Sequence, residues 1–296
     1  MTAARPRVTF ALPAYNRPQL LAEALAGLAA QSDAADWDVV VCDDLGRDDT
    51  RQVVESFPRA RFQYMRSPGP SGAVANWNRC LAAGRGDWVS VLHEDDGLYS
   101  WYLDTVAPRL RDGVSAVAVR TVEAAERPEL GRPPRPASAR SLAYPPRYFI
   151  KSSMSPFPGV MVRRSTALAL GGFDPQWGPL ADYEFWYRLA CSGPVEVMRV
   201  RAAFYRVAPG QWTERAWTDM VRLTHLLRLR IAREQFAGSP RVGRWLARFF
   251  SFRNAEAYAR RFGDRPESLR RALRLGSIPG ARLPSGWVWR GVRWSA

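Results

Sequence analysis

Residues 37–44 of the chain read WDVVVCDD, and residues 88–97 read WVSVLHEDDG. Each stretch is a short apolar run that stops at acidic side chains, and such runs are typical of strands buried on both faces. Residues 8–12 alternate apolar positions and are followed by Pro13. We therefore predict strands in these three places, with polar side chains at their carboxyl ends.

Helical patterns separate the predicted strands. Residues 18–31 repeat leucine and alanine along one face of a helix. Further helices are predicted at 49–57 and 72–83, and further strands at 61–66 and 114–122. This alternation favours an α/β fold with a mostly parallel sheet flanked by helices. Ligands of such sheets bind beyond the carboxyl ends of the strands, where the acidic residues fall.

The second half of the chain has a less regular pattern. Residues 123–147 are rich in proline and arginine and show no period, which predicts a long loop. The sequence then predicts a helix near 182–191, a strand pair around 195–207, and helices from 213 onward that include 266–275. We expect three parts, residues 1–122, 123–212 and 213–296, of which the last is a helical C-terminal extension.

Positive charge is concentrated at one end of the chain. The net charge is +15, and residues 1–198 are neutral, with 22 basic and 22 acidic side chains, whereas residues 199–296 hold 21 arginines and 6 acids. Such an excess fits a solvated basic face, contact with an anionic membrane surface, or an acidic partner. No nucleic-acid-binding motif accompanies it, so we expect no nucleic-acid partner.

Cysteine use and hydropathy predict the compartment. The three cysteines lie far apart and form no CxxC pair, which argues against a disulfide framework or a zinc site. No window reaches the roughly 18 apolar residues that a spanning helix needs, and the N-terminus has no signal-peptide pattern. We expect a cytoplasmic protein, with peripheral binding at the inner face of the membrane as an option for residues 213–296.

Two acidic clusters are candidate ligand-binding sites, and each also has a purely structural interpretation. Adjacent carboxylates at 95 and 96 form a hard oxygen site suited to Mg²⁺ or Mn²⁺, or else a solvated acidic turn. Asp44 can accept a hydrogen bond from a nucleobase or a ribose hydroxyl, or else belong to a capping loop.

Two single residues have the same double interpretation. Tyr15, at a strand end, can stack on a nucleobase or pack as a loop aromatic. Asp182, at the start of a predicted helix, can act as a general base or as an N-cap.

Five motifs occur in order along the chain. They read FALPAYNRPQLLAEAL, VVVCDDLGRDDT, GAVANWNRCLAAGRGDWVSVLHEDDG, GVMVRRSTALALGGFDP and ADYEFWYRL, and the stretch FYRVAPGQWT follows them. Over roughly residues 7–213 this series resembles the inverting family 2 glycosyltransferases of the GT-A fold, and the ordered set is far more specific than any one motif.

The resemblance implies a role for individual positions. It places in the nucleotide-sugar pocket the residues Pro13, Tyr15, Asn16, Asp44, Asn78 and Asp95. Asp95 and Asp96 match the DXD-type pair, with Asp96 as the direct metal ligand, and Asp182 matches the catalytic base. Residues 1–122 would then be the nucleotide-sugar half, and residues 123–212 the acceptor half.

The implied reaction moves a sugar from a UDP- or dTDP-sugar to an acceptor hydroxyl with inversion, assisted by Mn²⁺ or Mg²⁺. The acceptor would be a sugar, a lipid-linked molecule or a small molecule. One departure stands out, because relatives carry a histidine facing the metal where this chain has Ala208. Its role would pass to Gln211, Arg206 or a water molecule. The alternatives are a catalytically silent nucleotide-sugar-binding protein and a basic nucleic-acid-binding protein.

Overall fold

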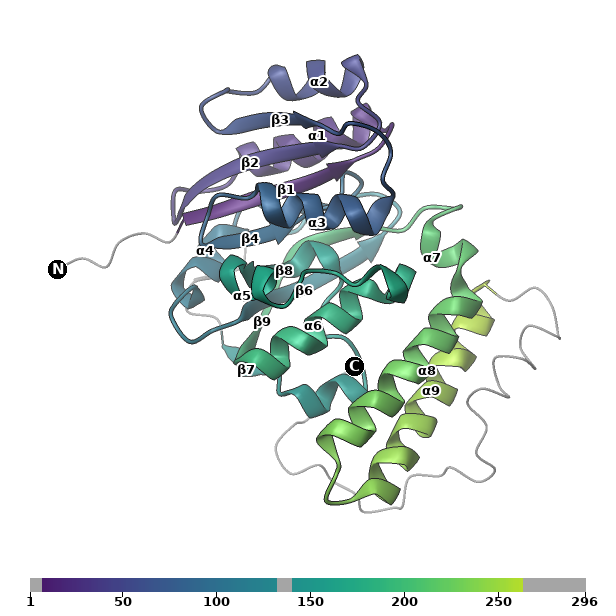
Figure 1. The fold of residues 1–296 in the computed structure, drawn as a ribbon. Coiled ribbons are helices and arrows are strands. Elements are labelled where there is room, and N and C mark those ends of the chain that lie inside the picture. Colours follow the sequence, from purple (N-terminus) through teal and green to yellow (C-terminus); the bar gives the residue numbers. More distant parts are fainter. Residues whose placement is uncertain (1–6, 132–139, 263–296) are drawn as a thin grey trace.

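The computed structural model describes residues 7–131 and 140–262, and its strands form one mixed sheet (Figure 1). The strands are β1 Arg7–Ala14, β2 Asp36–Asp43, β3 Phe62–Arg66, β4 Trp88–Val91, β5 Gly97–Leu98, β6 Ala116–Ala124, β7 Ser141–Ala143, β8 Val160–Arg163 and β9 Val195–Arg206. Their order is β3-β2-β1-β4-β8-β6-β9-β5, and β7 pairs with β9.

Helices connect the strands and continue beyond them. The α-helices are α1 Pro18–Ala29, α2 Asp48–Glu55, α3 Ala73–Ala83, α4 Tyr102–Val106, α5 Arg164–Ala169, α6 Ala181–Ser192, α7 Trp212–Arg215, α8 Trp217–Gln235 and α9 Pro240–Phe262. Short 3₁₀ helices are η1 Ala107–Arg109, η3 Pro146–Ile150, η4 Phe157–Gly159 and η5 Pro175–Leu180. The helix predicted at 266–275 lies outside the described residues.

Strands β1 to β4 form a parallel part of the sheet, as the βαβ pattern predicted. Strand β1 pairs with β2 along its whole length and with β4 on its other side. In this register Ala14 lies beside Asp43, and the backbone of Leu92 bonds to Ala11. The loops after β1, β2 and β4 therefore emerge at the same edge, which is where an α/β sheet binds its ligands.

The second half of the sheet contains antiparallel pairs that the sequence did not predict. Strand β8 is antiparallel to both β4 and β6, and it joins the parallel pair β6 and β9 to the rest of the sheet. The strand pair expected around 195–207 is wrong. One continuous strand, β9, replaces it, because β6 pairs along one side of it while β5 and β7 pair along the other. Residues 141–143, expected in a loop, form β7.

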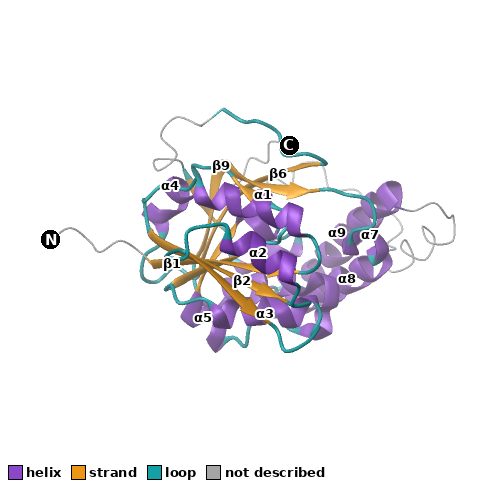
Figure 2. Ribbon diagram, turned by 90° about the horizontal axis from the view of Figure 1, so that it is seen from above, coloured by secondary structure: helices purple, strands orange, loops and turns teal. Residues whose placement is uncertain are grey.

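Helices cover both faces of the sheet (Figure 2), and an apolar cluster lies on each face. Along β1, Phe10 and Leu12 face the cluster formed with α1 and α4, whereas Ala11 faces the cluster formed with α3, α5 and α6. Side chains that alternate in this way are the signature of a strand covered on both faces. The α/β fold with flanking helices is confirmed.

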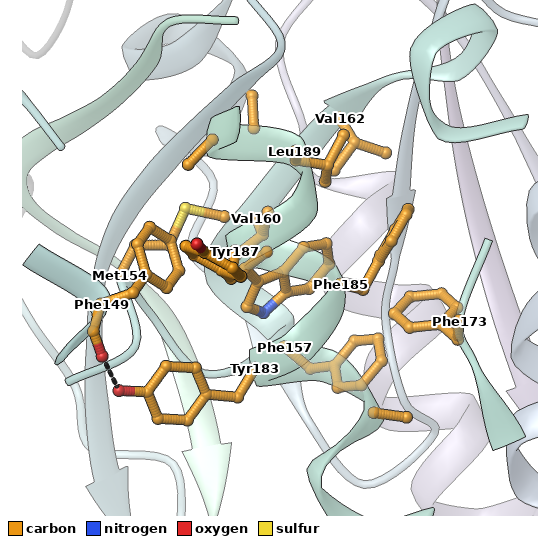
Figure 3. Close-up of a cluster of buried hydrophobic side chains, with 14 of the residues drawn as sticks. Phe149, Met154, Phe157, Val160, Val162, Phe173, Tyr183, Phe185, Tyr187 and Leu189 are labelled. Carbon is orange, nitrogen blue, oxygen red and sulfur yellow. Dashed lines mark hydrogen bonds between the residues drawn. The ribbon is translucent and has the colours of Figure 1, made fainter. Parts of the chain in front are cut away.

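Aromatic side chains of α6 anchor that helix in the core (Figure 3). Trp186 packs edge-on against Phe157 and Phe173, with ring centroids 5.6 and 5.7 Å apart. The hydroxyl of Tyr183 donates to the carbonyl of Phe149. These contacts fix the first turn of α6, and Asp182 lies in that turn.

Helices α8 and α9 run side by side as an antiparallel pair at the edge of the sheet domain (Figure 1). The buried guanidinium of Arg228 joins the pair to η3, because it donates to the carbonyls of Ile150, Lys151 and Phe250 at 2.8 to 3.0 Å. The helices predicted from residue 213 are thus present up to 262. In the part of the chain that the structure describes, no helix combines the length and apolar character needed to cross a membrane.

Candidate functional site

The loop after β1 reaches the acidic loop after β4. The backbone N–H of Tyr15 donates to Glu94 at 2.9 Å, and Arg17 donates to Glu94 at 2.8 Å and to Asp95 at 2.6 Å. Asn16 has a φ of 59°, a left-handed conformation that asparagine tolerates better than most residues. This sharp turn directs Arg17 back to the acids and leaves the Tyr15 side chain 52% exposed.

Asp96 is the most deeply buried acid of that loop. Its Oδ1 accepts the backbone N–H of Arg206 at 3.1 Å, while its Oδ2 is buried without a hydrogen-bond partner. Burial, followed by the charge of Asp95, raises the pKa of Asp96 well above its usual value. A buried carboxylate oxygen with no partner is costly, and it requires a proton or a cation.

His93 supplies the third group of the cluster. Its Nδ1 lies 3.9 Å from Asp96 Oδ2, and ligand atoms of His93, Asp95 and Asp96 all lie within 4.8 Å of one another. The ring packs against Trp77 and Phe157, with centroid distances of 5.3 and 4.4 Å. Burial lowers the pKa of His93 to about 4, so the imidazole is neutral near pH 7. A neutral imidazole has the lone pair that a metal ligand needs.

Arg206, at the end of β9, bonds to the acidic loop that follows β4. Its guanidinium donates to the carbonyl of Asp95 at 3.0 Å, to Glu23 at 2.6 Å and to Glu126 at 3.2 Å. Only 10% of its side chain is exposed. A cation with this many partners positions the loop, and it is not free to take the role of the histidine that Ala208 replaces. Gln211 is likewise bonded to the Arg206 carbonyl through its amide nitrogen.

Asp44 lies at the same sheet edge but is engaged elsewhere. Its carboxylate accepts bonds from the backbone of Ser71 and Gly72, from the Ser71 hydroxyl and from Arg79. Burial alone would raise the pKa of Asp44, but these hydrogen bonds hold it below its usual value. The segment that leads into α3 therefore already occupies the carboxylate that was predicted to contact a nucleobase.

The side-chain amide of Asn78, on α3, bonds to the turn at residues 171–173. Its amide donates to the carbonyl of Phe173 at 2.8 Å and accepts the Phe173 N–H at 2.7 Å. Gly172 beside it has a φ of 69°. The role expected for Asn78 at the nucleotide stays a prediction, and the contacts that the structure gives it are with this turn.

Asp182 lies in the first turn of α6, after the kinked helix η5. Its Oδ1 accepts the backbone N–H of Tyr183 at 2.7 Å. Burial raises the pKa of Asp182 to about 6. The N-cap interpretation is wrong, because Leu180 is the N-cap residue of α6 and Asp182 is the second residue of the helix. A carboxyl group with this pKa is suited to proton transfer, and its role as general base stays a prediction.

The structure brings some predicted residues together and leaves others apart. Tyr15, Asp95 and Asp96 share one hydrogen-bonded cluster, into which the chain from Pro13 to Asn16 leads. Asp182 bonds to the backbone of Tyr183, in the first turn of α6. Asp44 and Asn78 bond to other segments.

Arg17, His93, Glu94 and Arg206 belong to the cluster as well. No role was predicted for the first three from the sequence, and Arg206 was considered only as a replacement for the missing histidine. The one signal available was the position of His93 and Glu94 between a strand and the acids.

The group of His93, Asp95 and Asp96 fits a divalent cation. Two carboxylates and a neutral imidazole form a donor set that Mn²⁺ and Mg²⁺ can use, and the unpartnered Oδ2 of Asp96 points to a ligand yet to be bound. Among the described residues this is the one group of three such side chains close enough to share an ion.

Solved structures share this architecture. The chain aligns with Staphylococcus aureus TarS, residues 1–349, in complex with UDP-GlcNAc, at a TM-score of 0.65 and 17% identity over 91% of this chain and 79% of that one. It also aligns with the mannosyltransferase PcManGT from Pyrobaculum calidifontis in complex with GDP-Man and Mn²⁺, at a TM-score of 0.60 and 17% identity over 93% and 88% of the two chains. The fold is that of the GT-A glycosyltransferases.

The family follows from the sequence itself. The family model described as "Glycosyl transferase family 2" matches residues 9–168, and the chain belongs to that family.

Two curated relatives are similar over shorter spans. The uncharacterized protein MT1568 of Mycobacterium tuberculosis is 28% identical, over 65% of this chain and 64% of its own length. A Campylobacter jejuni GalNAc(5)-diNAcBac-PP-undecaprenol beta-1,3-glucosyltransferase is 31% identical, over 38% of this chain and 37% of its own length. The chain thus spans less than two thirds of the length of either.

Proposed function

We propose that the protein transfers a sugar from a nucleoside-diphosphate donor to an acceptor hydroxyl, with inversion at the anomeric carbon. The observation that carries the proposal is the cluster of His93, Asp95 and buried Asp96 at the carboxyl edge of the sheet, in a family 2 chain. A uridine or thymidine diphosphate sugar is the proposed donor. TarS was solved with UDP-GlcNAc, which supports this donor class.

The acidic cluster and the tyrosine loop take the donor side. Asp96, with Asp95 and His93, would hold Mn²⁺ or Mg²⁺ through two carboxylates and an imidazole. When bound, the ion supplies positive charge to the diphosphate. The exposed ring of Tyr15 stacks on the base, and Pro13 and Asn16 shape the turn that presents it.

Asp182 takes the acceptor side. Its pKa of about 6 leaves the carboxylate ionised at pH 7, yet close enough in basicity to accept a proton from a hydroxyl as that hydroxyl attacks. The transition state of such a displacement has oxocarbenium character. Residues 1–122 supply the donor side and residues 123–212 the base, and the two share one continuous sheet.

Asp182→Asn tests the proposal. We expect the variant to lose transfer by about 10²-fold or more, the range that general bases supply, because the amide cannot accept the proton. Binding of the nucleotide sugar with Mn²⁺, measured by calorimetry, should persist. Asp174→Asn is the matched control, since Asp174 caps the neighbouring helix η5 and should leave turnover unchanged. Turnover near the wild-type rate in the Asp182 variant would remove the base from the mechanism.

We further propose that the helical extension rests on an anionic membrane surface. On α9 the exposed side chains of Arg241, Arg244 and Arg248 flank the half-buried rings of Trp245 and Phe249, which stack with centroids 5.4 Å apart. Basic side chains near a lipid surface contribute about 1 kcal/mol each. Co-sedimentation with vesicles containing anionic lipid, but not with neutral vesicles, is the expected result. A lipid-linked acceptor, such as the name of the Campylobacter relative indicates for that enzyme, would suit this location.

A further inference from the structure

The carboxylate of Asp44 is saturated with hydrogen bonds from within the protein. Asp44 is only 3% exposed, and its oxygens accept the backbone N–H groups of Ser71 and Gly72 at 2.9 and 3.0 Å. They also accept the Ser71 hydroxyl at 2.6 Å and the guanidinium of Arg79 at 3.1 Å. An ionised carboxylate has about four lone-pair sites, and these four donor groups fill them. An N–H group of a nucleobase could therefore bond to Asp44 only by displacing one of its present partners.

Arg79, in contrast, has donors to spare. Its Nη1 donates to Asp44 at 3.1 Å and to the side-chain oxygen of Asn76 at 3.0 Å, and its Nη2 donates to the Ser71 hydroxyl at 2.9 Å. A guanidinium has five N–H groups, and within the described part of the chain three of them have an acceptor. The Nε–H and one N–H of Nη2 remain available, on a side chain that is 22% exposed.

A series of direct contacts joins Arg79 to the tyrosine loop. Arg79 lies on α3, and its bond to Ser71 brings the guanidinium back beyond the first residue of that helix, which is the direction that long helical side chains take. Asp44, which holds the guanidinium, donates its backbone N–H to the carbonyl of Ala14 at 3.0 Å. Ala14 directly precedes Tyr15, whose side chain is exposed. The free N–H groups of Arg79 therefore lie at the same edge of the sheet as the ring proposed to stack on the base.

We propose that Arg79 recognises the edge of the donor's base, and that Asp44 is a positioning residue that holds Arg79 and the start of α3 in place. The inference rests on the proposed function, because it concerns the base of the nucleotide donor. A guanidinium can only donate hydrogen bonds. It therefore bonds to a carbonyl oxygen of uracil or thymine, whereas the amino group of cytosine offers it no acceptor. The protein should select bases that present a carbonyl oxygen to Arg79 over bases that present an amino group there.

Binding of UDP and of CDP in the presence of Mn²⁺, measured by calorimetry, tests this assignment. The two nucleotides differ only at one edge of the base, so the ratio of their Kd values is insensitive to a general loss of binding. We expect the wild type to bind UDP about tenfold more tightly than CDP or better, which is the discrimination that well-placed hydrogen bonds to a base edge supply. Arg79→Met keeps an unbranched side chain without the guanidinium, and it should bind the two nucleotides equally.

Two further variants accompany this one. Arg51→Met is the matched control, because Arg51 is 58% exposed on α2 and pairs with Glu55, and its preference for UDP should equal that of the wild type. Arg79→Lys keeps a positive charge beside Asp44 but lacks the planar fork of donors. It should lose the preference as well, and it replaces Arg79→Met if the melting temperature shows that the methionine variant does not fold.

Asp44→Asn distinguishes a positioning role from direct contact with the base. If the carboxylate bonded to the N3–H of uracil, an amide N–H at the same place would fit the unprotonated N3 of cytosine, and the preference would switch to CDP. We expect instead that both nucleotides bind more weakly and that UDP is still preferred, because the amide holds Arg79 less firmly but does not replace it.

The outcomes separate this inference from the proposed function. A preference for UDP that survives the loss of the Arg79 guanidinium would overturn the inference, and so would a switch to CDP in the Asp44 variant. Equal binding of UDP and CDP by the wild type would overturn it too, while leaving the transferase proposal intact. A wild type that binds neither nucleotide and hydrolyses no nucleotide sugar contradicts the proposed function itself.

Discussion

At the scale of single residues, the site depends on carboxyl groups that the fold keeps out of water. Asp96 has an unpartnered oxygen, Glu94 has a pKa raised by burial to about 7, and Asp182 has one raised to about 6. Each group is costly to the fold in its charged form. The proposed roles of Asp96 and Asp182 are therefore opposed to the stability of the fold at these two positions.

Asp182→Asn should stabilise the protein at neutral pH. The folded carboxyl has a raised pKa, so its burial costs nothing below the ordinary pKa of 3.8, and the cost is fully present above about 6. Asparagine keeps an oxygen for the Tyr183 N–H but carries no charge. Urea unfolding at pH 8 should show a gain on the order of 2 kcal/mol, and the gain should shrink toward pH 4. A gain that did not change with pH would point to a cause other than the buried charge.

Asp96→Asn should abolish the response of the protein to metal. A ligand that binds only the folded state at 100 times its Kd stabilises it by about 2.7 kcal/mol, or several degrees in melting temperature. We expect Mn²⁺ to raise the melting temperature of the wild type and of Asp112→Asn, whose side chain is fully exposed. The Asp96 variant should show no rise. An equal rise in all three proteins would place the ion elsewhere.

At the scale of elements, a short turn positions the helices α3, α5 and α6 relative to one another. The turn at 171–173 fastens α5 to α3 through the Asn78 amide, and α6 follows it through η5. Trp77 on the same helix stacks on His93. Helix α3 thus supports the acidic loop on one side and the approach to Asp182 on the other.

The two glycines of that turn should respond differently to alanine. Both have positive φ, so each substitution costs roughly 1–2 kcal/mol of backbone strain. A Cβ at Gly171 meets nothing within 4 Å, whereas a Cβ at Gly172 would lie 2.3 Å from the Asn78 oxygen. Gly172→Ala should therefore lose a further 1–3 kcal/mol as the amide bonds break. Equal melting temperatures for the two variants would show that the turn adapts.

The hydrophobic pattern predicted the strands that are buried on both faces. It failed for strands whose extent depends on the strands that they pair with. The runs at 8–12, 37–42 and 88–93 are buried on both faces and proved to be β1, β2 and β4. Strand β8 was missed, and β9 was split because its neighbours change along its length.

In the candidate site, too, local sequence patterns were predictive and long-range contacts were not. Asp95 and Asp96 were found because they are adjacent in sequence at the end of a strand. The bond between Arg17 and Glu94 spans 77 residues, and that between Arg206 and Asp96 spans 110, so no local pattern reveals them. The resemblance supplied positions for Asp44 and Asn78, but only coordinates show what each already binds.

At the scale of the whole molecule, the sheet domain and the helical pair are joined through buried polar contacts. Arg228 is the clearest of these, because one guanidinium satisfies carbonyls from η3 and from α9. The boundary expected at 122/123 falls within β6.

Arg228→Lys should loosen the extension. The shorter ammonium cannot reach all three carbonyls, and each buried carbonyl left without a partner costs about 1–3 kcal/mol. We expect a lower melting temperature and faster amide exchange in α8 and α9 than in β1 to β4. Arg233→Lys, at an exposed position on the same helix, is the control and should behave as the wild type. Uniform exchange across both parts would mean that they open together.

Every wall of a cavity of about 160 Å³ at the end of β9 comes from residues 205–262, after nearly all of the sheet is complete. The proposed donor side and this cavity are therefore encoded by separate stretches of the gene. A recombination crossover near the end of β9 would exchange the cavity and leave the sequence of strands β1 to β8 unchanged. Chimaeras joined at that point would combine the sheet of one family member with the cavity of another.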